Sequence, residues 1–223
     1  MRYIKHILLA VILPGAILSP MAYGQEADNC DLKKDEEGIY VYLCDNDSSN
    51  FKTIIVELDV PATLSQYAAA VLDVNSYLQW QYNMLQIKVL KKVSPTEFYY
   101  YSEVETPWPI TNRDFIFHLK MWQEPDTRIL KVEMHGVPDF IPKKKNKVRI
   151  PSSHSMLTVT PTGPDSVHVR YVLDIDPGGE VPAWIANMFA AQAPWQTYHN
   201  LRNRLIKQGK NRIKVDFIKD YVD

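Results

Sequence analysis

The side chains best able to do acid–base, nucleophilic or metal chemistry are spread along the chain without a recognisable arrangement. Ser152-Ser153-His154-Ser155 places serines beside a histidine but lacks the GxSxG elbow of a serine hydrolase. Glu103 and Glu105 alternate onto one face of a predicted strand with Tyr101, as an acid pair or as an ordinary solvent-facing strand. No ligand spacing such as HExxH connects the six histidines, which are His6, His118, His135, His154, His168 and His199. We therefore predict no catalytic residues, no metal site and no cofactor.

Arg113 and Asp114 stand next to each other at the start of a predicted strand. One interpretation is a structural ion pair that ties the sheet to a loop. The other is that Arg113 meets the polar head group of a ligand inside the protein, because a buried charge is retained where it has a task. The sequence leaves both interpretations open.

The first 24 residues have the layout of a secretory signal peptide. Arg2 and Lys5 form a basic head, an apolar run of 12 residues covers positions 7–18, and Ala22-Tyr23-Gly24 offers small residues for cleavage. The run is shorter than the ~20 residues that cross a bilayer as a helix; an N-terminal membrane anchor is the alternative. We expect export to a periplasmic or secreted location, with residues 1–24 removed.

Export would place Cys30 and Cys44 in an oxidising compartment, which favours a disulfide. If the turn-like residues 35–38 close a hairpin, Cys30 falls opposite Leu43 or Cys44, within one residue of the register that a bridge needs. Two unrelated, half-buried thiols are the alternative.

The composition is that of an ordinary globular protein. Of 223 residues, 46% are hydrophobic and 23% are charged, with 25 Lys and Arg against 26 Asp and Glu. A chain this apolar is not disordered over most of its length. A net charge of -1 gives no general reason to bind nucleic acid. We expect a monomer with one domain at residues 25–209 and a C-terminal extension at 210–223.

The middle of the chain predicts two short helices and an antiparallel sheet. Thr63-Leu64-Ser65-Gln66 has capping-box spacing and begins a helix that continues to Leu72, and a second helix is predicted over residues 76–82. Short polar turns separate the strand pairs, and such turns force antiparallel neighbours. The predicted strands cover residues 39–43, 53–60, 85–93, 96–105, 114–123, 128–137, 155–162 and 166–175.

A long helix is predicted from Ala183 to about Gln208. Pro194 should bend it near its middle. Its apolar stripe repeats every three or four residues and consists of Trp184, Met188, Ala191, Trp195, Tyr198, Leu201 and Leu205. The fold class is therefore α+β, a curved antiparallel sheet wrapped around a long C-terminal helix, with two short helices near the N-terminus.

Several segments resemble START domains, the steroidogenic-acute-regulatory-related lipid transfer family. Residues 106–115, which include Trp108 between two prolines and Asn112-Arg113-Asp114, resemble the family's PWP…NRD segment. Asp176-Pro177-Gly178-Gly179 resembles its lead into the C-terminal helix, and the resemblance covers residues 30 to about 208. It implies the helix-grip fold of the Bet v 1-like superfamily and a deep apolar cavity for one lipid-like molecule.

The resemblance implies a carrier, transfer or sensing module that binds a lipid or another hydrophobic molecule beneath the C-terminal helix. The alternative is a helix-grip enzyme of the cyclase or aromatase type that acts on a hydrophobic substrate. The basic loop at residues 143–149 is either a solvated loop or a site of transient contact with an anionic membrane. The residues expected to contact the ligand are Trp108, Arg113, Tyr100, Trp184, Met188 and Trp195, and the lid is expected to hinge at Gly178, Gly179 and Pro194.

Overall fold

The computed structural model describes residues 29–221 apart from 48, 50, 182 and 210–212, and the side chains of residues 183–189 also lie outside the description. Within this part of the chain no helix combines the length and the apolar character needed to cross a membrane. The elements are β1 (Cys30–Glu36), β2 (Ile39–Cys44), β3 (Thr53–Val60), α1 (Leu64–Leu72), the 3-10 helix η1 (Val74–Gln79), β4 (Met84–Ser94), β5 (Glu97–Val104), β6 (Arg113–Gln123), β7 (Leu130–Gly136), β8 (Val148–Arg149), β9 (Ser152–Gly163), β10 (Ser166–Asp176) and α2 (Ala183–Gln208).

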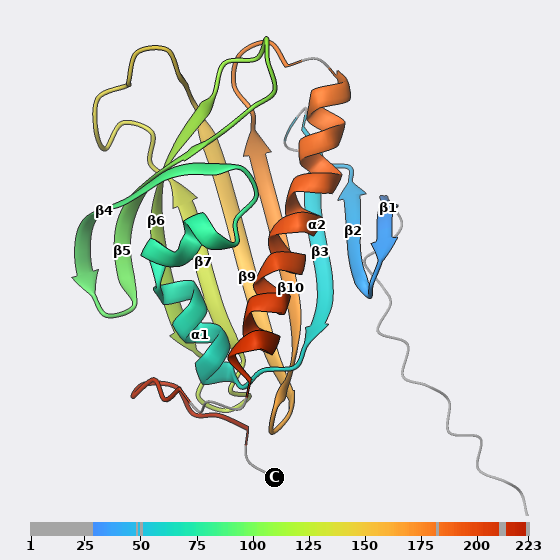
Figure 1. Ribbon diagram of the computed structural model, residues 1–223, viewed down its shortest axis with the longest axis vertical. Coiled ribbons are helices and arrows are strands. Elements are labelled where there is room, and N and C mark those ends of the chain that lie inside the picture. Colours follow the sequence, from blue (N-terminus) through green and yellow to red (C-terminus); the bar gives the residue numbers. More distant parts are fainter. Residues whose placement is uncertain (1–28, 48, 50, 182, 210–212, 222–223) are drawn as a thin grey trace, which may run out of the picture.

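One curved sheet and the long helix α2 define the architecture (Figure 1). The strands follow the order β1-β2-β3-β10-β9-β7-β6-β5-β4, and each neighbouring pair on this path is antiparallel. The short strand β8 pairs in parallel with the start of β6. Helix α2 packs against β1, β2, β3 and α1. The predicted α+β fold, with a curved sheet around a C-terminal helix, is confirmed.

Local hydrogen bonds mark the start of each of the two helices between β3 and β4. Thr63 accepts a hydrogen bond from the Gln66 backbone N–H at 3.1 Å, and the Gln66 side chain accepts one from the Thr63 N–H at 2.9 Å, which is the predicted capping box. The second helix is a 3-10 turn that begins at Val74, two residues earlier than predicted. The Ser76 hydroxyl and N–H both bond the Asp73 carbonyl, which tightens the chain directly after α1.

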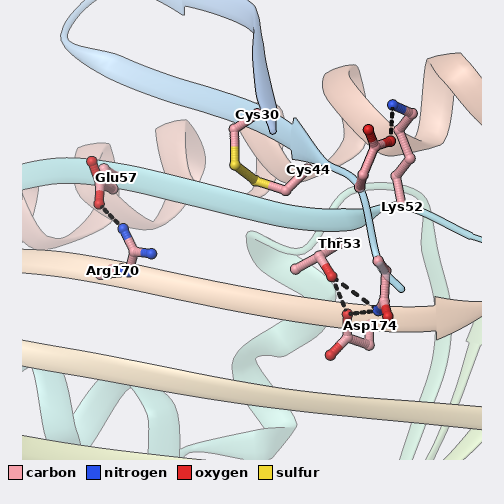
Figure 2. The surroundings of a disulfide bond; sticks show 9 residues. Cys30, Cys44, Lys52, Thr53, Glu57, Arg170 and Asp174 are labelled. Atoms are coloured by element: carbon pink, nitrogen blue, oxygen red, sulfur yellow. Dashed lines mark hydrogen bonds and ion pairs between the residues drawn. A yellow bond between two sulfur atoms is a disulfide. The ribbon is translucent and has the colours of Figure 1, made fainter. Parts of the chain in front are cut away.

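Cys30 and Cys44 face each other at the paired ends of β1 and β2 and are joined by a disulfide (Figure 2). The two residues are 14 apart in sequence, and a crosslink over such a loop stabilises the fold by about 3 kcal/mol through the unfolded chain. The bond also fixes the start of the β2–β3 loop. At the other end of that loop Thr53 donates a hydrogen bond to the Asp174 carboxylate of β10 (Figure 2).

A buried ion pair holds the loop between β7 and β9 over the outer face of the sheet. Arg149 binds both oxygens of Asp114, with Nε at 2.8 Å and Nη2 at 3.0 Å, and each side chain is 1% exposed. The guanidinium also donates to the carbonyl oxygens of Pro138 and Ile141. The pairing of Arg113 with Asp114 is therefore wrong. Consecutive strand residues point to opposite faces of a sheet, so these two side chains separate.

The basic loop is less solvated than its composition indicates. Lys147 forms an ion pair with Glu103, which is buried rather than solvent-facing, and Tyr101 donates to the same carboxylate at 3.3 Å. The Lys144 ammonium lies 3.7 Å from the centre of the Tyr101 ring. Two of the loop's lysines therefore contact side chains of β5 and hold the loop against this strand.

The C-terminal tail packs beside α1. Ile218 is buried in the main hydrophobic core. The Asp220 carboxylate accepts hydrogen bonds from the Ser65 N–H and hydroxyl, both at 2.8 Å, at the positive N-terminal end of α1. Arg128 donates to the Asp220 carbonyl at 2.7 Å. The described residues beyond α2 thus close the end of the sheet near α1.

Candidate functional site

A cavity of about 500 Å³ lies between the inner face of the sheet and α2. Phe115 and Phe117 of β6, Leu157 of β9 and Leu173 of β10 supply apolar wall. They face inward because alternate residues of a strand share a face. Phe51 is 39% exposed and also lines the cavity, so the wall reaches solvent at the β2–β3 loop.

Helix α2 presents small side chains to this cavity. Ala190, Ala193, Pro194 and Thr197 line it, and their spacing of three and four residues places them along one side of the helix. Bulky residues at these positions would fill the space beneath α2. The small side chains therefore leave space beneath this part of α2, whereas Tyr198 and Leu201 of the same helix also reach the cavity wall.

The large residues of the helix anchor it beside the cavity. Trp195, expected to contact the ligand, lies outside the cavity wall, and this prediction is wrong. Its indole N–H donates to the Glu36 carbonyl of β1 at 3.2 Å, and the Lys34 ammonium lies 4.4 Å from its ring centre. Neighbouring helix positions are about 100° apart, so Trp195 points to the β1–β2 edge while Pro194 faces the cavity.

Six tyrosines line the wall, and the five other than Tyr82 form a more polar part of it. Burial raises the pKa of each of these five, to about 12 for Tyr171. Tyr77 donates its hydroxyl hydrogen to the Val71 carbonyl at 2.5 Å, whereas the buried Tyr67 hydroxyl has no hydrogen-bond partner among the described residues. A ligand oxygen beside Tyr67 would satisfy it. The five are Tyr67, Tyr77, Tyr100, Tyr171 and Tyr198.

Arg113 brings a buried guanidinium to the cavity, at the end where the chain passes from β10 to α2. It donates to the carbonyl oxygens of Thr111 at 2.6 Å, Gly178 at 3.3 Å and Pro177 at 3.5 Å. No carboxylate among the described residues forms an ion pair with it. Burial lowers the pKa of Arg113 because the charged form loses contact with water. The arrangement leaves a desolvated positive charge facing an apolar space.

The other predicted ligand contacts have mixed outcomes. Tyr100 lines the cavity as expected and is buried, and its hydroxyl lies 3.5 Å from the Met134 sulfur. Trp108 is 91% exposed and outside the wall, so that prediction is wrong, because its loop projects beyond the start of β6. Trp184 and Met188 lie outside the residues whose side chains are described.

Two of the predicted hinge residues, Gly178 and Gly179, lie where the chain leads into α2, and the third lies within that helix. Gly178 and Gly179 have φ of 63° and 65°, which glycine adopts most readily. A Cβ on Gly178 would also approach Pro151 at 3.0 Å. Pro194 lies inside α2 and lines the cavity. Opening of the lid at these residues stays a prediction.

Four of the five tyrosines and the two phenylalanines were not assigned to the site from sequence. A signal was available on β6, because Arg113, Phe115 and Phe117 alternate onto one face. For Tyr67, Tyr77, Tyr171 and Tyr198 no local pattern distinguishes a cavity wall from a filled core.

The wall combines a large apolar surface with a smaller number of polar side chains. Among the described residues that line it there is no histidine, cysteine, aspartate or glutamate. The wall provides apolar surface, tyrosine hydroxyls, the Arg113 guanidinium and the polar side chains of Lys52, Gln81, Ser102, Thr106 and Thr197.

Comparison with known proteins assigns the chain to a family. The START domain model matches residues 23–210, so the chain belongs to the START domain family, a family of lipid-binding and lipid-transfer domains. An uncharacterised protein of Pseudomonas aeruginosa is 29% identical over 92% of this chain and the whole of its own length.

Two further relatives have descriptive names. A solved fragment of a STAR-related lipid transfer protein from Xanthomonas axonopodis is 32% identical with a TM-score of 0.73, over 80% of this chain and 99% of that one. The mouse phosphatidylcholine transfer protein is 25% identical, and the match covers 62% of this chain and 72% of the relative.

The buried tyrosines predict a loss of stability in alkali. Their pKa values in the folded protein are raised above the unfolded value of 10.0. Their contribution to the free energy of unfolding is therefore complete below pH 10. It is lost as the pH rises above 10, because the tyrosines then ionise only in the unfolded chain. In that range each tyrosine lowers the free energy of unfolding by about 1.4 kcal/mol per pH unit.

We expect tyrosinate absorbance to rise in two phases, with exposed tyrosines ionising near pH 10 and the cavity tyrosines only as circular dichroism reports unfolding. Reversible ionisation of all tyrosines near pH 10, with the fold intact, would contradict the burial of these tyrosines in the folded protein.

Proposed function

We propose that this protein binds one lipid or similar hydrophobic molecule beneath α2 and transfers it between membranes. The observation that carries the proposal is the largely apolar cavity of about 500 Å³ beneath α2, several of whose lining side chains on that helix are small. Its volume lies in the range of small-molecule sites, roughly 300–1,000 Å³. The wall's lack of acids and histidines among the described residues supports binding without catalysis.

Arg113 is proposed to select a ligand with an anionic group. Its guanidinium is buried, faces the cavity and is bonded to carbonyl oxygens rather than to a carboxylate. Guanidinium groups bind phosphate and carboxylate oxygens through paired hydrogen bonds. A phospholipid would place its phosphate at Arg113 and its acyl chains along the aromatic wall. The name of the phosphatidylcholine transfer protein relative supports this class of ligand.

A vesicle transfer assay tests the role of Arg113. Donor vesicles of phosphatidylcholine carry either a fluorescent phosphatidylcholine or a fluorescent diacylglycerol, which lacks the phosphate. Arg113→Leu should reduce phosphatidylcholine transfer by about tenfold to a hundredfold, because a hydrogen bond to a charged group contributes about 1.5–3 kcal/mol. Diacylglycerol transfer should change little.

Arg113→Lys is the matched control, since it keeps the charge and loses the paired geometry. Its rate of phosphatidylcholine transfer should fall between those of the wild type and Arg113→Leu. If a folded Arg113→Leu variant lost the transfer of both lipids equally, head-group selection by Arg113 would be refuted. Absence of transfer of either lipid by the wild type would count against the transfer function itself.

The loop that carries Trp108 is proposed to touch the membrane during transfer. Trp108 is 91% exposed, a side chain typical of membrane–water interfaces, and its loop leads directly into Arg113 at the cavity end. This assigns membrane contact to the β5–β6 loop rather than to the basic loop, whose Lys147 is paired with Glu103.

Trp108→Ala should lower the fraction of protein that sediments with phosphatidylcholine vesicles by about tenfold, because burying a large apolar side chain contributes roughly 1.5–3 kcal/mol. The amount of lipid bound at equilibrium should stay unchanged. Val93→Ala is the control, since Val93 is 50% exposed beside the β4–β5 turn. Equal vesicle binding by Trp108→Ala and Val93→Ala would sink this role.

The protein is further proposed to act outside the cytosol. The basic head and apolar run before Gln25 support export, and so does the disulfide between Cys30 and Cys44, since disulfides persist in oxidising compartments. Intact-mass measurement on protein from the exported fraction should find a chain that begins at Gln25 and has no titratable thiol. A chain that retains residues 1–24 and two free thiols would contradict export.

A further inference from the structure

Three potential metal ligands meet on the outer face of the sheet, away from the lipid cavity. Glu133 and His135 lie on β7, and His154 lies directly opposite His135 on the neighbouring strand β9. Met134, between the first two, points to the cavity, so Glu133 and His135 point to the other face. The strand register therefore brings together residues that have no ligand spacing in the sequence.

The ligand atoms of the three side chains lie close together. The Glu133 carboxylate oxygen lies 3.0 Å from Nε2 of His135 and 3.4 Å from Nε2 of His154, and the three ligand atoms all lie within 4.8 Å of one another. The imidazole rings are stacked, with centres 4.5 Å apart. In a tetrahedral zinc site with bonds of about 2.0–2.1 Å, ligand atoms stand about 3.3 Å apart. The distances to Glu133 match that spacing.

We propose that Glu133, His135 and His154 bind a divalent transition metal of the zinc class. Imidazole and carboxylate ligands suit zinc, copper and nickel, whereas calcium and magnesium prefer oxygen ligands alone. Two histidines and one glutamate leave a fourth position for water. Both strands lie inside the sheet rather than in loops, so the backbone holds the ligands in place.

The neighbouring histidines define the limits of the site. His118 on β6 pairs with His135 in register, but its Nε2 lies 2.8 Å from Glu97 and its ring stacks on Tyr99. His168 on β10 faces a single carboxylate, Asp59, at 2.9 Å. Each is a histidine with an acidic partner that lies outside the group of three close ligand atoms, which makes both matched controls.

The test is calorimetric titration of Zn²⁺ into the chelator-treated full chain, purified without a polyhistidine tag. We expect binding of one Zn²⁺, with Ca²⁺ and Mg²⁺ giving no signal. Changes in the shell around a metal's ligands commonly reduce affinity about 10–100-fold, so His135→Ala, His154→Ala and Glu133→Gln should each lose at least that much. His118→Ala and His168→Ala should keep wild-type affinity.

Thermal unfolding with and without Zn²⁺ gives a second measurement and checks that every variant folds. Zn²⁺ should raise the unfolding temperature of the wild type and of both control variants but not of His135→Ala or His154→Ala. No Zn²⁺ binding by the wild type, or equal binding by His135→Ala and His168→Ala, would overturn the site. Either result leaves the lipid-transfer proposal untouched, because the cluster lies on the opposite face of the sheet.

Discussion

The structure depends on how α2 is supported above the sheet. The helix packs against β1, β2, β3 and α1, at one side of the curved sheet. The Trp195 indole and its hydrogen bond to Glu36 fix the helix to the β1–β2 edge. Ala190, Ala193 and Thr197 are small side chains of the helix that line the cavity. The cavity follows from this support because a sheet that curves under a helix leaves space wherever large side chains are missing.

Strand alternation separates the charges of the site. Asp114 points to the outer face, where Arg149 binds both of its carboxylate oxygens and holds the covering loop. Arg113 points inward, where it binds the carbonyl oxygens of Pro177 and Gly178 before α2. One dipeptide thus anchors a loop on one face and places a positive charge in the cavity on the other. The charge in the cavity also contacts the segment where the lid is predicted to hinge.

Much of the fold could be predicted from the sequence because its signals are local. The capping box at Thr63 begins α1, strand alternation marks most of the sheet, and the turn after Asp35 sets the hairpin in which Cys30 meets Cys44. The cavity was predicted from the family resemblance and not from a local signal.

The remaining features depend on contacts between distant segments. Which side of α2 faces the cavity could not be predicted, because apolar residues cover more than one side of the helix. Trp195 packs at the β1–β2 edge of the sheet rather than in the cavity. Alternation could have separated Arg113 from Asp114, but the partner Arg149 lies in a loop whose β8 strand has no sequence signal. The meeting of His135 with His154 required the register of β7 and β9.

Native mass spectrometry of protein taken from its own compartment tests the central claim most directly. One lipid should remain bound to each chain, and its fragmentation should reveal an anionic group with apolar chains. Ala193→Trp, which would place a large ring in the cavity, should fold and carry none. A wild-type chain that is always free of lipid, or an Ala193→Trp chain that carries the same lipid in the same amount, would contradict a binding cavity beneath α2.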